Sequence, residues 1–99
     1  MDTVNVFEYR GQSKPLLKTT RSTADVFTLP AGYDSGHDAT HKGDQIIYVI
    51  EGSAVARLSG EERPVRAGDL VMIPAGTPHA LRTGSEPLFA LTILAPPEM

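Results

Sequence analysis

The stretch Gly68-Asp69-Leu70-Val71-Met72-Ile73-Pro74-Ala75-Gly76-Thr77-Pro78-His79 decides the fold predicted for this chain. It starts with a turn at 67–69 and continues as a short strand at 70–73, because apolar and β-branched residues between turn residues favour β structure. At 74–78 the fixed φ of proline and the conformational freedom of glycine predict a rigid turn. This turn delivers His79 to a defined place on the following strand.

Short β-rich runs also fill the rest of the chain, between clusters of Gly, Pro, Asp and Ser. The strongest run is 45–50, and we expect a turn at 51–53 to lead from it into a strand at 54–58. No window carries the i, i+3, i+4 apolar spacing of a helix. Further strands are expected at 4–9, 24–29, 63–66, 79–82 and 88–94. The pattern predicts about eight or nine strands at spacings of roughly ten residues, which is typical of an all-β sandwich or barrel.

Length and composition indicate one small globular domain over residues 1–99. Hydrophobic residues make up 40% of the chain, the net charge is -3, and cysteine is absent, so disulfides and thiolate metal sites are excluded. There is no run of Lys or Arg, and nucleic-acid binding is therefore not expected. The first residues lack the basic and apolar regions of a signal peptide. The strongest apolar run, 46–50, is far shorter than the ~20 residues that span a bilayer. We expect a cytoplasmic protein without a membrane segment.

The stretch at 68–79 resembles the second signature motif of the cupin family, whose members are double-stranded β-helix barrels with the jelly-roll arrangement. That motif reads Gly, five residues, Pro, one residue, Gly, two residues, His. Gly68, Pro74, Gly76 and His79 match it position for position, and Thr83 stands where the family usually has Asn. The resemblance implies a cupin-like barrel.

The segment at 39–52 resembles the first cupin motif in a reduced form. His41 and Gly52 match, whereas Gln45 replaces the usual Glu and Ala39 replaces the first His. Fifteen residues separate the two motifs, a short spacing that is similar to that of small microbial cupins.

The resemblance implies a metal site inside the barrel. In the family, three His and one Glu converge on one divalent transition metal; here the set is reduced to His41, Gln45 and His79. Strand side chains alternate between faces, so His41 and Gln45 share the inward parity of Ile47 and Val49. The implied metals are nickel, zinc, iron, manganese or copper. Gln45 supplies only a neutral oxygen, which weakens the site, and its alternative role is a hydrogen bond within the barrel.

Two further residue assignments stay open at the level of sequence. His37 shares the inward parity, but it lies roughly 13 Å from His41 along an extended strand. It can act as a ligand only if the chain bulges between them, and otherwise it is a residue of the surface or of the pocket mouth. The inward positions of both motifs carry no carboxylate, so no catalytic acid or base is assigned.

Two classes of function agree with this pattern. The first is a metal-dependent enzyme that acts on a small organic molecule, as an oxygenase, isomerase, lyase or decarboxylase. The alternative is a non-catalytic, metal-free protein that binds a small molecule in the same internal pocket. A homodimer is expected in both cases, because small cupins resemble one another in pairing and because the apolar runs 4–9 and 88–94 would leave exposed edges.

Overall fold

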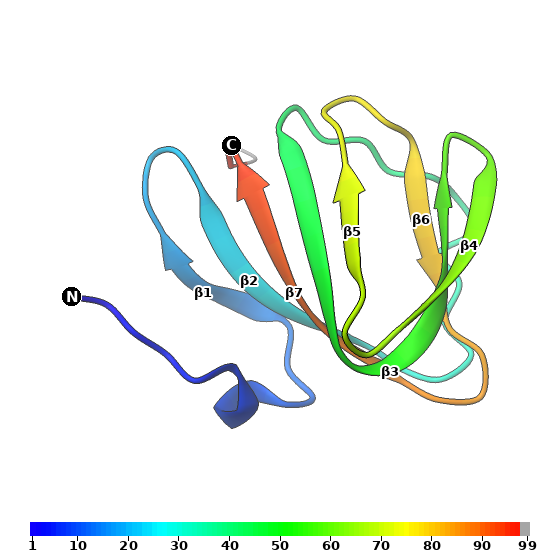
Figure 1. Cartoon of the computed structure of the whole chain (residues 1–99), viewed down its shortest axis with the longest axis horizontal. Helices are drawn as coiled ribbons and strands as arrows, with labels where there is room; N and C mark the ends of the chain where they lie inside the picture. The colour runs from blue at the N-terminus through cyan, green and yellow to red at the C-terminus, as the bar shows by residue number, and fades with distance from the viewer. Residues whose placement is uncertain (98–99) are drawn as a thin grey trace.

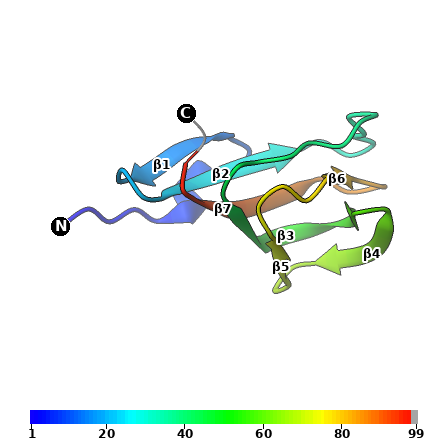
Figure 2. The same cartoon turned by 90° about the horizontal axis from the view of Figure 1, so that it is seen from above.

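The computed structural model describes residues 1–97 and shows an all-β jelly-roll built from two antiparallel sheets (Figures 1 and 2). The elements in chain order are the short 3-10 helix η1 (Val6–Tyr9) and the strands β1 (Lys14–Lys18), β2 (Thr23–Leu29), β3 (Asp44–Leu58), β4 (Glu61–Arg66), β5 (Leu70–Ile73), β6 (His79–Arg82) and β7 (Leu88–Ala95). One sheet has the order β1-β2-β7-β3-β5, and the other joins β4 and β6 to the far half of β3. The expected all-β cupin-like architecture is confirmed.

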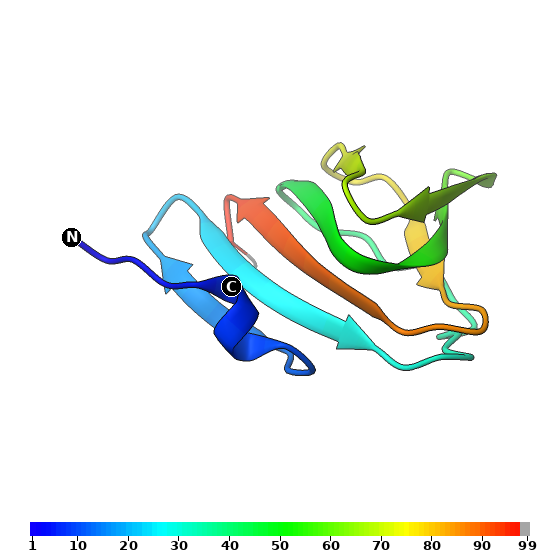
Figure 3. The same ribbon diagram turned by 60° about the horizontal axis from the view of Figure 1, so that its bottom comes forward.

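The long strand β3 belongs to both sheets. Its first half pairs with β5 and β7, and its second half pairs with β4 and β6. Between the halves the register with β7 shifts at Val49/Glu51, and Gly52 adopts a φ of 88°. Figure 3 shows the resulting bend. The predicted turn at 51–53 was therefore wrong, because a bulge and a glycine bend the strand without ending it.

The N-terminal prediction was also wrong. Residues 4–9 do not form a strand; η1 occupies 6–9, and the side chain of Asn5 accepts a hydrogen bond from the Phe7 amide at 2.9 Å. Such a local side-chain bond stabilises a helical turn in competition with extended structure. The continuity of β3 merges two further expected strands into one, and β1 was not among the expected ranges, so residues 1–97 contain seven named strands in place of eight or nine. No helix in that range is long and apolar enough to cross a membrane.

The core lies between the two sheets, and alternation along the strands fills it. Ile47 and Val49 on β3 are 2% and 1% exposed, and Gln45 on the same face is 8% exposed. The inward parity predicted for this strand is thus observed. The other buried members of the cluster are Ala54, Ala56, Val65, Ile73, Leu88 and Ala90, and Phe27 and Leu29 from β2 pack against it.

Candidate metal and ligand site

His79 is placed by the proline-rich turn that precedes β6. Gly76 takes a φ of 78°, and the Thr77 amide donates to the Pro74 carbonyl at 3.1 Å, which closes the turn. The His79 ring is buried, and its Nδ1 lies 2.9 Å from the Thr77 carbonyl oxygen. Because a carbonyl only accepts, Nδ1 carries the proton of this bond in the neutral ring, and Nε2 keeps its lone pair. The turn therefore fixes both the place and the tautomer of His79.

His41 lies in the loop before β3, and the structure brings it against His79. The two ring centroids are 5.0 Å apart, with 42° between the ring planes. Backbone hydrogen bonds hold the loop: Ala39 and His79 exchange two of 2.8 and 2.9 Å, and the Gly76 amide donates to the His41 carbonyl at 2.8 Å. On the outer side, Arg57 Nε donates to Asp38 at 3.0 Å. The predicted pairing of the two histidines is seen, although His41 reaches it from a loop and not from a strand.

Gln45 points into the barrel, as expected from its parity. Its Nε2 donates to the Thr92 hydroxyl of β7 at 2.8 Å. Its Oε1 is buried and has no hydrogen-bond partner among residues 1–97. The amide is therefore oriented by Thr92, and an oxygen lone pair is left available in the interior.

Asp25 is an interior carboxylate that the motif-based interpretation missed. It lies opposite Thr92 in the β2–β7 register and shares the face of Phe27, which packs on the core. Its Oδ1 is buried without a partner in the described part of the chain, and burial raises the pKa of this carboxyl from its ordinary value. The signal was present in the sequence, because Asp25 has the parity of Phe27 and Leu29 within the run 24–29.

His37 and Thr83 both lie outside the group formed by His41, Gln45 and His79. His37 is exposed, and its Nδ1 lies 3.1 Å from the Ser35 carbonyl, within a local turn. Thr83, which replaces the family's Asn, is buried; its hydroxyl donates to the Pro30 carbonyl and accepts from the Tyr33 amide at 2.8 Å. Thr83 thus anchors the start of the loop that ends at His41.

The spacing of the two histidines fits a shared metal ion. Two imidazoles bound at about 2.0–2.1 Å to one ion would place their ring centres about 4.5–5.2 Å apart, and the observed spacing is 5.0 Å. Within residues 1–97, no three His, Cys, Asp or Glu side chains are grouped so that they could hold a metal. A site at the His41–His79 pair would therefore need an oxygen of another kind, and the unpaired Oε1 of Gln45 is such a donor.

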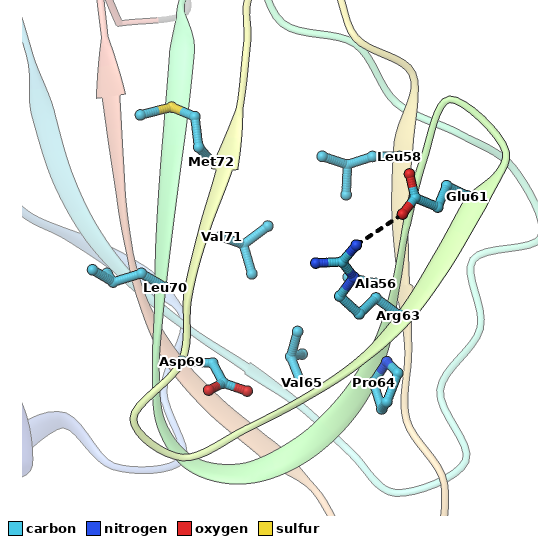
Figure 4. Close-up of a pocket in the computed structure, with 10 residues that line it drawn as sticks. All are labelled: Ala56, Leu58, Glu61, Arg63, Pro64, Val65, Asp69, Leu70, Val71 and Met72. Atoms are coloured by element: carbon cyan, nitrogen blue, oxygen red, sulfur yellow. Dashed lines mark hydrogen bonds and ion pairs between the residues drawn. The ribbon is translucent and has the colours of Figure 1, made fainter.

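Two hollows of the described chain are large enough for a small ligand. One of about 530 Å³ is open to solvent and is lined by Thr40, His41, Lys42, Ala75 and Gly76. A second, of about 430 Å³, opens between β4 and β5, with apolar side chains such as Leu58 and Val71 inside and the Glu61–Arg63 ion pair beside it (Figure 4). Of the two histidines, His41 lines the first hollow. Both volumes are in the range that small ligands occupy.

Comparison with known proteins identifies the family. A family model described as a cupin domain matches residues 25–94, a range that contains both motifs and Asp25. The chain belongs to the cupin family. This cupin is 29% identical to an uncharacterized protein of Streptomyces coelicolor over 82 residues, which cover 83% of this chain and 77% of that protein.

Two other relatives differ in how much of their own length this chain matches. The crystal structure of TT1209 from Thermus thermophilus matches this cupin with a TM-score of 0.83 and 28% identity, over 97% of this chain and 98% of that chain. Quercetin 2,3-dioxygenase of Bacillus subtilis is 35% identical over 82 residues, which cover 75% of this chain and 23% of the enzyme. The cupin domain is shared with an enzyme, but the match leaves most of that enzyme uncovered.

Proposed function

We propose that this cupin binds one divalent transition metal weakly, through His41, His79 and Gln45, and holds a small organic ligand beside it. The observation that carries the proposal is the His41–His79 pair, with ring centres 5.0 Å apart. The bond from His79 Nδ1 to the Thr77 carbonyl supports it, because it leaves Nε2 as the metal-binding nitrogen. The buried, unpartnered Oε1 of Gln45 supports the third ligand.

The donor types decide which metals are expected and how tightly they bind. Imidazole nitrogens favour nickel, copper, zinc or iron over calcium and magnesium, which prefer shells of oxygen. None of the three proposed ligands carries a negative charge, so the ion keeps its full charge and the affinity is low. A bound ion would supply Lewis-acid polarisation of a ligand oxygen. The protein's own contribution is to fix His79 through Thr77 and the Gln45 amide through Thr92.

Binding, without a named reaction, is the function that the geometry supports best. The dioxygenase relative is matched over 23% of its length, and the described residues place no carboxylate in a metal-binding group with the two histidines. A metal-free binding protein remains the alternative outcome of the metal titrations described below. In that case His41, Gln45 and His79 are hydrogen-bonding groups for a small ligand.

Restoring the missing charge with Gln45→Glu should tighten the binding of Ni²⁺ about tenfold, a change of ~1.4 kcal/mol. A carboxylate both neutralises the dication and donates more strongly than an amide oxygen. Calorimetric titration of metal-stripped protein measures the effect. Gln12→Glu is the matched control, because it makes the same change at an exposed position and should leave the affinity unaltered. Equal or weaker binding by Gln45→Glu would contradict Gln45 as a ligand.

We also expect the protein to be a homodimer, with a mass about twice the 10.6 kDa of one chain. On the outer face of β3 and β5, Tyr48 pairs with Leu70 and Ile46 with Met72, and Tyr48, Leu70 and Met72 are 41%, 70% and 55% exposed. An apolar face of this kind is typical of an interface. In light scattering, Leu70→Glu should give a monomer, whereas the exposed control Thr20→Glu should not. A parent protein of monomer mass at all micromolar concentrations would refute the dimer.

A further inference from the structure

The barrel interior contains a partly buried carboxylate, with one oxygen fully buried, that the proposed metal site does not use. Asp25 faces the interior from β2, opposite Thr92 on β7. Its Oδ1 is inaccessible, and no group in the described chain donates a hydrogen bond to it. A carboxylate that serves only the fold is normally paired, because unpaired burial of an acceptor is unfavourable.

A second orphan acceptor, Gln45 Oε1, flanks the same threonine. Gln45 Nε2 is committed to the Thr92 hydroxyl at 2.8 Å, so the amide leaves only its oxygen unpaired. Two oxygens that receive no hydrogen bond from the described residues therefore flank Thr92: Asp25 Oδ1 from β2 and Gln45 Oε1 from β3. This part of the interior accepts hydrogen bonds, and within residues 1–97 neither oxygen receives one.

We propose that Asp25 is the anchor of a second subsite in the barrel, which binds a hydrogen-bond donor, a hydroxyl or an amine, of the small ligand. The subsite deepens the proposed function, since it assigns the class of ligand to the same interior. Its anchor is not one of the proposed metal ligands, because Asp25 does not form a metal-binding group with the two histidines among the described residues; Gln45 Oε1 stays assigned to the metal. A hydroxyl or amine of the ligand would donate a charge-assisted hydrogen bond to Asp25 Oδ1.

The direction of the Asp25 pKa shift agrees with a carboxylate that receives no hydrogen bond in the described chain. Burial raises the pKa of Asp25 above its ordinary value of 3.8. Below 3.8 the carboxyl is protonated in the folded and the unfolded chain, and burial of the charge costs no stability. As the pH rises through the folded pKa, the carboxylate ionises inside the barrel and the fold loses stability. At neutral pH a ligand donor would relieve this loss.

The test uses metal-stripped full-length protein, so failure of the metal proposal leaves the result unaffected. Backbone amide shifts in NMR titrations follow three probes: catechol, benzylamine and 1,2-dimethoxybenzene, which has the shape of catechol but no O–H. We expect at least one of the two donor probes to shift the amides of Asp25 and Thr92, and the diether to bind at least about tenfold more weakly, the scale of one lost polar contact. Preference for catechol would identify a neutral hydroxyl donor, and preference for benzylamine an ammonium donor.

The variant Asp25→Asn separates a ligand subsite from a structural carboxylate. It should weaken the preferred donor probe about tenfold and should not lower the melting temperature at pH 7, since it removes a partly buried charge that no group in the described chain compensates. Glu8→Gln, at an exposed carboxylate, should change neither. The proposal is overturned if Asp25→Asn melts lower or fails to fold, if it binds the probes as the parent does, or if the diether binds as well as both donor probes. Binding of neither donor probe to the parent would also overturn it.

Discussion

Replacing His79 by Ala is expected to lower the affinity for Ni²⁺ or Zn²⁺ about a hundredfold or more, which corresponds to ~2.7 kcal/mol. The side chain supplies one of only two imidazoles in the proposed site, and its Nε2 is oriented by the bond from Nδ1 to the Thr77 carbonyl. Neither of the other proposed ligands carries a charge that could compensate for the loss. Calorimetric titration of metal-stripped, untagged protein measures the change.

The matched control is His37→Ala, which removes the same side chain from an exposed loop. Its ring contacts the Ser35 carbonyl, and its loss should leave the metal affinity within experimental error. Because His79 is buried, thermal melting must first show that His79→Ala is folded, and His79→Gln provides a second variant that keeps more of the side-chain volume. The metal proposal is wrong if the parent binds no metal, or if a folded His79 variant binds as tightly as the parent.

The parts of the fold that depend on local chemistry could be predicted from the sequence. Strands at 70–73 and 79–82 were predicted with the observed bounds, because Gly and Pro residues fix the turns that separate them. The inward position of Gln45 followed from simple alternation with Ile47 and Val49. The proximity of His41 and His79 came from the family motifs, and the structure accounts for it through the Ala39–His79 backbone bonds.

The features that were missed depend on contacts between distant segments. Glu51-Gly52-Ser53 has the composition of a turn, but pairing of 44–52 with β7 and of 53–58 with β4 keeps the strand continuous. Residues 4–9 have an apolar content compatible with a strand, whereas the Asn5 side chain favours a helical turn. The inward parity of Asp25 could be read from the run 24–29, but its position opposite Thr92 depends on the pairing of β2 with β7.

The continuity of β3 leads to the second large effect: Gly52→Ala should destabilise the fold by about 3 kcal/mol or more, on the scale of severe overpacking. A Cβ at Gly52 would lie 1.9 Å from the Pro87 carbonyl oxygen and 3.2 Å from Leu88 Cα. Both neighbours are backbone atoms, one of the residue before β7 and one of its first residue, so they cannot move aside as a flexible side chain would. The φ of 88° adds strain for any residue with a Cβ.

Gly60→Ala separates these two causes. Gly60 has a nearly equal φ of 83°, but a Cβ there would meet nothing within 4 Å. Its cost should be backbone strain alone, about 1–2 kcal/mol, so thermal or urea unfolding should show a clearly larger loss for Gly52→Ala. Equal losses in the two variants would mean that the approach of β3 to Pro87 does not constrain the fold. A larger loss in Gly52→Ala, as expected, would mean that close contact at Gly52 holds the bend in β3. This bend lets one strand carry Gln45 in the first sheet and pair with His79 in the second.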